Sequence, residues 1–138
     1  MLSLVTTNCV VEAARAYQVP IAAVVGILRA EGGKVGTLHR NPDGSVDYGP
    51  MQVNSTWLPT LSRVGITPTL LRDDGCLNVA VGAWILRSNI IQNSGSLWAG
   101  IGAYHSAHAS LSHWYQMRVY HELVATPNFT ETIDAANP

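Results

Sequence analysis

The feature that most constrains this chain is an apolar stretch between Asn78 and Asn93. Apolar side chains occupy most of its positions, and they fall on nearly every side of the helix that the stretch predicts. A helix that is apolar almost all round is normally the buried centre of a domain, because a surface helix keeps a polar face. Other segments must cover this helix, and we therefore predict a compact, mainly helical domain.

Two helices are expected before this stretch, at residues 7–17 and 20–31. Pro20 suits the first turn of the second helix, where its missing N–H costs nothing, and Gly32-Gly33 ends it. The other expected elements are a small hairpin or irregular loop within 34–49, helical segments at 55–61, 67–73, 96–104 and 109–125, and a loose tail at 126–138 that lacks apolar periodicity. The folded domain is thus expected to be residues 1–125.

Composition excludes several functions. The net charge of −1 leaves no broad basic face for nucleic acid, and no apolar run approaches the roughly 20 residues that span a bilayer. Residues 1–5 are too short for a signal peptide, so the chain is cytoplasmic or its export signal has been removed or lies outside it. Cys9 and Cys76 form no Cys-x-x-Cys pair. They are either two reduced thiols or one disulfide, which would require an oxidising compartment.

Glu31 is a candidate general acid. It follows Ile27 and Leu28 by four and three residues, so it extends the apolar face of its helix. Burial and the negative end of the helix dipole both disfavour a carboxylate there and raise its pKa, as acid catalysis of glycoside cleavage requires. From this segment alone, an exposed or salt-bridged glutamate at a helix end is the commoner arrangement.

Two other segments carry polar or aromatic groups suited to a sugar. Residues 47–57 combine a Gly-Pro bend with Gln52, whose amide can donate and accept hydrogen bonds, and with Tyr48 and Trp57. Trp57 is more naturally a core residue, and Asp47 a structural one. Residues 102–108 place Tyr104 after an apolar helix. The histidines nearby have no zinc-like spacing, and we expect no metal and no cofactor.

These segments together resemble a known family over roughly residues 9–125. The matching motifs, in order, are Ala30-Glu31-Gly32-Gly33, residues 41–45, Asp47-Tyr48-Gly49-Pro50-Met51-Gln52-Val53-Asn54-Ser55-Thr56-Trp57, Cys76-Leu77-Asn78 with Gly82-Ala83-Trp84, and Gly102-Ala103-Tyr104. They are similar to the specialised lytic transglycosylases of bacterial secretion and conjugation systems, which have a lysozyme-like α+β fold. The resemblance implies cleavage of peptidoglycan between N-acetylmuramic acid and N-acetylglucosamine, with formation of a 1,6-anhydro ring.

The resemblance also assigns residues. Glu31 falls on the catalytic glutamate, and Gln52, Met51 and Tyr104 fall on cleft positions; Tyr48, His105 and Gly32 are further candidates for contact with substrate. Cys9 and Cys76 match a family disulfide. The implied protein is a monomer, periplasmic or secreted, that acts on glycan strands and serves secretion, conjugation or pilus machinery.

Two positions depart from the family pattern. Gly32 stands where the family usually has serine, and His105 stands where it has asparagine. The alternatives are therefore lysozyme-type hydrolysis, a weakly active peptidoglycan-binding or assembly protein, and a cytoplasmic helical domain with two free thiols.

Overall fold

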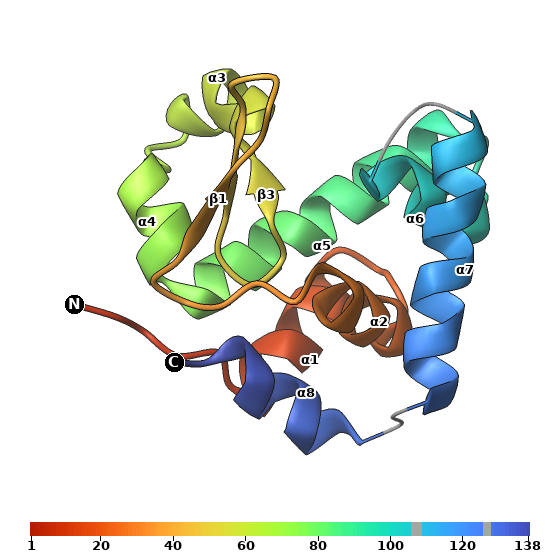
Figure 1. Ribbon diagram of the computed structural model, residues 1–138, viewed down its shortest axis with the longest axis horizontal. Coiled ribbons are helices and arrows are strands. Elements are labelled where there is room, and N and C mark those ends of the chain that lie inside the picture. Colours follow the sequence, from red (N-terminus) through yellow and green to blue (C-terminus); the bar gives the residue numbers. More distant parts are fainter. Residues whose placement is uncertain (106–108, 126–127) are drawn as a thin grey trace.

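The structure is a computed structural model that describes residues 1–105, 109–125 and 128–138. Its centre is α5 (Gly75–Gln92), which crosses the molecule and buries residues on most of its sides (Figure 1). The predicted central helix and the mainly helical fold are confirmed. The helix begins earlier than Asn78 because the Asp74 side chain caps it, accepting a hydrogen bond from Leu77 N (3.0 Å).

Two N-terminal helices pack beside α5. α1 (Thr7–Ala16) and α2 (Ile21–Glu31) meet at an angle of 120°. Cys9 and Cys76 form a disulfide that ties α1 to the first turn of α5. In the described parts of the chain no single helix is long and apolar enough to cross a membrane; the bent pair α1 and α2 passes that test together, by length and composition alone.

A small antiparallel sheet follows α2. Its strands are β1 (Leu38–Arg40), β2 (Val46–Tyr48) and β3 (Val53–Asn54), in the order β1-β2-β3. The expected hairpin is β1–β2, with Leu38 opposite Tyr48, and β3 was not expected. The 3-10 helix η1 (Ser55–Trp57) and the short helices α3 (Leu58–Ser62) and α4 (Pro68–Asp73) complete this side of the molecule.

The opposite side is formed by α6 (Leu97–His105) and α7 (Ala109–Ala125) (Figure 1). α7 lies unusually close to α2 at Gly26, where a Cβ atom would come within 2.8 Å of a Val119 methyl group. This close approach brings the side chains of α7 to the end of α2, so the glycine helps to position the site described below.

The expectation of a loose tail is wrong for residues 129–136. These residues form α8 (Phe129–Ala136), with Ile133 buried. Asn137 pairs with the backbone of Val5, donating to its oxygen (3.0 Å) and accepting from its nitrogen (2.8 Å). The two segments that hold α8 in place, α2 and the chain around Val5, are remote from it in sequence. Apolar periodicity within the tail therefore did not reveal this helix. Thr126 and Pro127 of the tail, like Ser106, Ala107 and His108, lie outside the described residues.

Candidate active site

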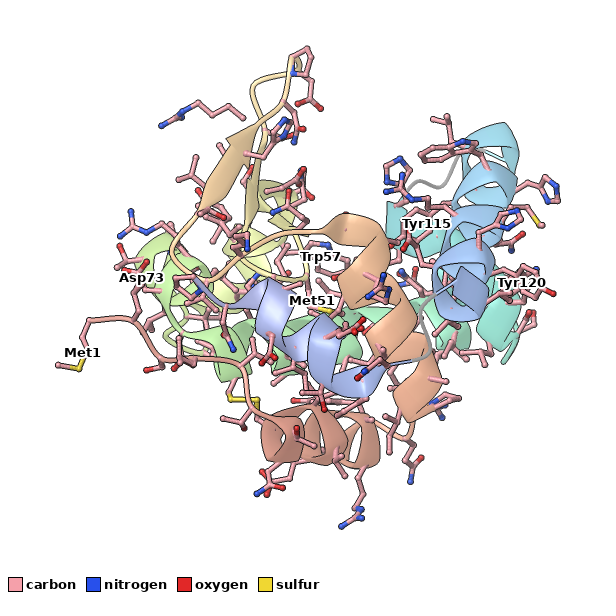
Figure 2. The ribbon with its side chains drawn as sticks, turned by 60° about the horizontal axis from the view of Figure 1, so that its bottom comes forward. Met1, Met51, Trp57, Asp73, Tyr115 and Tyr120 are labelled. Atoms are coloured by element: carbon pink, nitrogen blue, oxygen red, sulfur yellow. A yellow bond between two sulfur atoms is a disulfide. The ribbon has the colours of Figure 1, made fainter. Side chains whose placement is uncertain are left out.

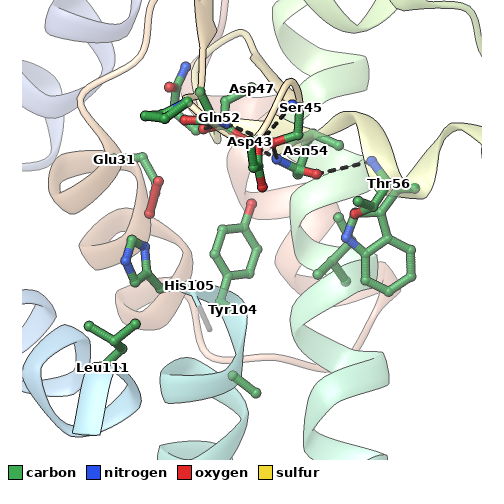
Figure 3. A pocket seen from close by; sticks show the side chains of 16 residues that line it. Glu31, Asp43, Ser45, Asp47, Gln52, Asn54, Thr56, Tyr104, His105 and Leu111 are labelled. Carbon is green, nitrogen blue, oxygen red and sulfur yellow. Dashed lines mark hydrogen bonds between the residues drawn. The ribbon is translucent and has the colours of Figure 1, made fainter. Parts of the chain in front are cut away.

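Glu31 is the last residue of α2 and lines a cleft. Gly32 follows it with a left-handed backbone (φ 65°) and donates its N–H to Leu28 O (3.1 Å), which ends the helix at Glu31. The side chain is therefore held on a rigid element, and it points toward Tyr104 and His105 across the cleft (Figure 3).

The Glu31 carboxyl is unusually basic. Its pKa is raised from 4.5 to about 7, chiefly by burial and in smaller part by the negative charge of Asp47. A hydrogen bond from Tyr115 and the positive charge of Arg118 act in the opposite direction, but burial outweighs them. Near neutral pH the group is thus present in both forms, and it can donate a proton in one and accept a proton in the other.

Mostly aromatic side chains from α6 and α7 lie beside this carboxyl. We call them the helical wall: Tyr104, His105 and Leu111, which line the cleft, and the buried Tyr115. Tyr115 donates its hydroxyl proton to Glu31 Oε2 (2.6 Å). Its ring is stacked against His105, with centroids 4.9 Å apart and planes 7° from parallel. Burial raises the pKa of Tyr115 well above its usual value, so the phenol stays protonated and remains a donor to Glu31.

Tyr115 is the residue beside Glu31 that sequence reasoning missed. It lies 84 positions from Glu31 and belongs to a helix for which only the helical state was predicted. The signal available in the sequence was the spacing of Tyr115 and Val119, which lie one helical turn apart. In the structure both side chains are almost fully buried. That spacing identifies the inner face of α7 but not the residue it meets.

The opposite wall belongs to the sheet; we call it the hairpin wall, formed by Asn41, Asp43, Ser45, Asp47 and Asn54. Asp47 accepts hydrogen bonds from the amide groups of Asn41 (3.0 Å) and Asn54 (2.8 Å). The Ser45 hydroxyl accepts from the same two amides and donates to Asp43 (2.6 Å). Each polar group on this wall is thus held in place by its neighbours.

The loop between the two walls is fixed by Asn78 of α5. This fully buried side chain accepts from Met51 N (2.7 Å) and donates to Tyr48 O (2.8 Å) and Leu71 O (2.9 Å). Gln52 adopts a left-handed backbone (φ 51°), and its side chain donates to Gly49 O (2.9 Å). A buried amide with three well-made hydrogen bonds gives the loop one conformation.

The two walls enclose a cleft of about 800 Å³, within the range typical of ligand sites (Figure 3). Four of the predicted site residues line it, namely Glu31, Gln52, Tyr104 and His105.

Three predicted contact residues lie elsewhere. Met51 is fully buried and fills the space left by Gly82, and Tyr48, the last residue of β2, is buried as well. Figure 2 shows Met51 in the interior of the molecule. Gly32 borders a separate small hollow with Arg29 and Lys34. A strand alternates its faces and a glycine at a helix end turns the chain outward, so neighbours of cleft residues need not face the cleft.

Comparison with known proteins gives the family. Residues 8–121 match the transglycosylase SLT domain. The chain belongs to this family. The Invasion protein IagB of Salmonella typhimurium (strain SL1344) is 34% identical over 100 residues, which are 72% of this chain and 62% of that protein. Protein IpgF of Shigella flexneri is 29% identical over 100 residues, 72% of this chain and 65% of its own. The chain therefore matches less than two thirds of the length of these relatives.

Membership of the SLT family confirms the resemblance and agrees with a lysozyme-like helical fold. One further cleft residue of this SLT domain is Trp57. Its ring packs edge-on against Trp84 (centroids 5.4 Å apart), so it belongs to the core as predicted, yet it also lines the cleft. Tyr104 is fixed as well, because its hydroxyl donates to Met51 O (2.8 Å). The cleft of this SLT domain is therefore walled by side chains whose orientations are already set.

Proposed function

We propose that this SLT domain is a peptidoglycan lytic transglycosylase. It would cleave the β-1,4 bond between N-acetylmuramic acid and N-acetylglucosamine and leave a 1,6-anhydro ring on the muramic acid. The observation that carries the proposal is the Glu31 carboxyl in the cleft, with a pKa of about 7. A carboxyl with this pKa serves as acid and then as base at neutral pH.

In the first step, protonated Glu31 donates its proton to the glycosidic oxygen. The bond from that oxygen to C1 of the muramic acid breaks, and its electron pair stays with the leaving N-acetylglucosamine. The acetamido oxygen of the same muramic acid bonds to C1 and stabilises the positive charge. Substrate assistance of this kind replaces the second carboxylate that most glycosidases use.

In the second step, the ionised Glu31 takes the proton of the 6-hydroxyl. The oxygen of that hydroxyl bonds to C1 and displaces the acetamido oxygen, which closes the anhydro ring and returns Glu31 to its protonated form. Tyr115 supports this cycle because its hydrogen bond to Oε2 (2.6 Å) holds the carboxyl in one orientation and stabilises the ionised form between the steps.

The other cleft residues would bind the sugar chain. Gln52 and His105 carry groups that hydrogen-bond hydroxyl and acetamido groups, and Tyr104 offers its ring because its hydroxyl is engaged with Met51. Met51 and Tyr48 act indirectly, by supporting the loop that carries Gln52.

One observation favours a second candidate, lysozyme-type hydrolysis. Asp47 lines the cleft, and its charge is close enough to raise the pKa of Glu31. Two carboxylates flanking a glycosidic bond are the usual arrangement for hydrolysis. Against this role, Asp47 already accepts hydrogen bonds from Asn41 and Asn54 through both oxygens, and such engagement makes it a poor nucleophile or base.

The proposed setting is the periplasm or cell surface, where the protein would open the wall locally for a secretion, conjugation or pilus apparatus. Two observations support it: the Cys9–Cys76 disulfide, which persists in oxidising compartments, and the similarity to a Salmonella protein named for invasion.

The test is digestion of purified peptidoglycan, with the products identified by mass spectrometry. The expected products carry 1,6-anhydromuramic ends, and Glu31→Gln is expected to lower the rate by about 100-fold or more. Glu12→Gln is the matched control, because Glu12 is an exposed residue of α1 that does not line the cleft. It should match the parent protein.

Two outcomes would overturn the proposal. Products with reducing ends and no anhydro ring would show that the reaction is hydrolysis and not transglycosylation. If the parent and the Glu31→Gln protein both bind glycan strands but neither cuts them, the protein has a binding or assembly role and not a catalytic one.

A further inference from the structure

The rim of the cleft continues onto α7 through a large side chain that the proposed function does not use. Leu111 lines the cleft, and Trp114 follows it by three residues, on the same side of the helix. The indole of Trp114 contacts the ring of His105, another cleft residue, with centroids 5.7 Å apart and planes 53° apart. Trp114 is nonetheless 53% exposed. One part of the ring is thus held against the cleft, and the rest is open to solvent.

This half-exposed ring lies at one end of the cleft. In Figure 3, Leu111 lies at one side of the close-up and Thr56 at the other, with Glu31 and Tyr104 between them. A cleft of about 800 Å³ holds only a few sugar units, whereas a glycan strand is a polymer. A strand bound at Glu31 must therefore leave the cleft and pass over its rim. A sugar beyond the cleft at the Leu111 end would lie next to Trp114, because that ring contacts His105 and follows Leu111 by three residues on the same helix.

The chemistry of that surface suits the apolar face of a sugar ring. Pyranose rings carry patches of C–H groups that pack against flat aromatic rings, and indole offers the largest such area of any side chain. The hairpin wall, by contrast, offers amide, hydroxyl and carboxylate groups. A sugar chain that crosses both regions finds hydrogen-bonding groups on one side and an aromatic platform at the end.

We propose that Trp114, supported by His105, is a stacking platform for a sugar ring beyond the cleft, and that it makes this domain prefer long glycan strands over short ones. The proposal rests on the proposed function only in taking a glycan strand as the ligand. It does not require that the strand be cut.

The experiment measures binding, so that it does not depend on catalysis. The Glu31→Gln protein, in which the proposed cleavage is blocked, is titrated by calorimetry with β-1,4-linked N-acetylglucosamine oligomers of two and six units and with glycan strands freed of peptide. Adding Trp114→Ala is expected to weaken binding of the long ligands about tenfold, equivalent to about 1.4 kcal/mol, and to leave the two-sugar ligand within about twofold. Trp114→Phe should recover part of the loss, because a smaller ring still stacks.

Tyr120→Ala provides the matched control. Tyr120 lies on the same helix and is 51% exposed, but it does not line the cleft and lies on the opposite side of α7 from Tyr115 (Figure 2). It should bind every ligand as the Glu31→Gln parent does. Unchanged melting temperatures would show that neither alanine disturbs the fold.

The outcomes separate this proposal from the proposed function. If the parent binds long ligands and Trp114→Ala binds them equally well, or if Tyr120→Ala loses as much, the platform is overturned and the proposed function stands. An effect of Trp114→Ala that appears only with peptide-bearing strands would assign the surface to the stem peptide and overturn the sugar platform. A parent that binds no glycan of any length would overturn both.

Discussion

The two walls of the cleft are built in different ways. The hairpin wall is held by hydrogen bonds between residues that lie close in sequence, such as Asn41 with Asp47 and Asn54 with Ser45. The helical wall is held by contacts between remote residues, such as Tyr115 with Glu31, 84 positions apart. A local turn sequence can therefore specify one wall by itself, whereas the other exists only when α2, α6 and α7 have packed together.

The walls also act on Glu31 in opposite directions. On the hairpin wall, the Asp47 carboxylate raises the pKa of Glu31, and on the helical wall the hydrogen bond from Tyr115 lowers it. Burial, the dominant effect, results from the packing of the whole site. Variants on the two walls should thus displace the pH dependence to opposite sides, which makes the comparison testable.

The largest expected effect is the dependence of stability on the charge of Glu31. The pKa of Glu31 is about 7 in the folded protein against 4.5 for an unperturbed glutamate. The folded state therefore binds this proton more tightly than the unfolded state, and stability falls as pH rises from 4.5 through 7, by about 3 kcal/mol. Glu31→Gln removes this loss. The free energy of unfolding of the variant, measured by urea denaturation, should therefore rise relative to that of the parent protein between pH 4.5 and 8.5. A constant difference between the two proteins would contradict burial as the cause.

The next effect tests the hairpin wall. Asp47→Ala removes one of the two acceptors shared by the Asn41 and Asn54 amides, and we expect about 2 kcal/mol lower stability by urea denaturation and slower peptidoglycan cleavage. Asp47→Asn keeps the shape but removes the charge. The pKa of Glu31 falls when the negative charge is gone, so the alkaline limb of the pH–rate profile should lie at lower pH in this variant than in the parent. An unshifted profile would show that Asp47 acts on structure alone.

A smaller effect tests the helical wall. Tyr115→Phe removes the hydrogen bond to Glu31, and we expect about tenfold lower kcat/KM, in keeping with about 1.4 kcal/mol for a bond to a charged group. The alkaline limb of the profile should move to higher pH, opposite to Asp47→Asn, because the lost bond had lowered the pKa of Glu31. Tyr120→Phe on the outer side of the same helix is the control. If the alkaline limb moved in the same direction in Asp47→Asn and Tyr115→Phe, the two walls would not act on the pKa of Glu31 in opposite directions.

The smallest effect concerns Gly32, which belongs to neither wall. Its backbone is left-handed, and a side chain there would meet no atom within 4 Å. Gly32→Ser should therefore lower stability by about 1 kcal/mol through backbone strain alone, measured by thermal denaturation, and leave kcat/KM unchanged. A several-fold gain in activity would show instead that the serine usual in the family takes part in the reaction.

Much of the architecture followed from patterns within single segments. Apolar spacing on one face predicted α2, the apolar stretch after Asn78 predicted α5, and the turn signal at residues 41–45 predicted the hairpin. These predictions held because each depends on neighbours within a few residues. α8 was missed because its stability comes from Val5 and from the surface of α2, which lie more than 100 residues away.

The site residues also differ in whether the sequence could identify them. Glu31 and Gln52 were identified from their segments and from the resemblance that the motifs carry, and both line the cleft. Met51 was assigned to the cleft and is buried, because its side chain fills the space beside Gly82.

The sequence by itself determined the helical class, the glutamate at the end of α2 and the polar hairpin. Each of these follows from residues close together in the chain. Only the tertiary structure decided that Tyr115 reaches Glu31, that Asn78 fixes the loop, and that burial brings the pKa of Glu31 to about 7. Those properties depend on desolvation and on distances between remote side chains, and neither quantity exists until the helices have packed.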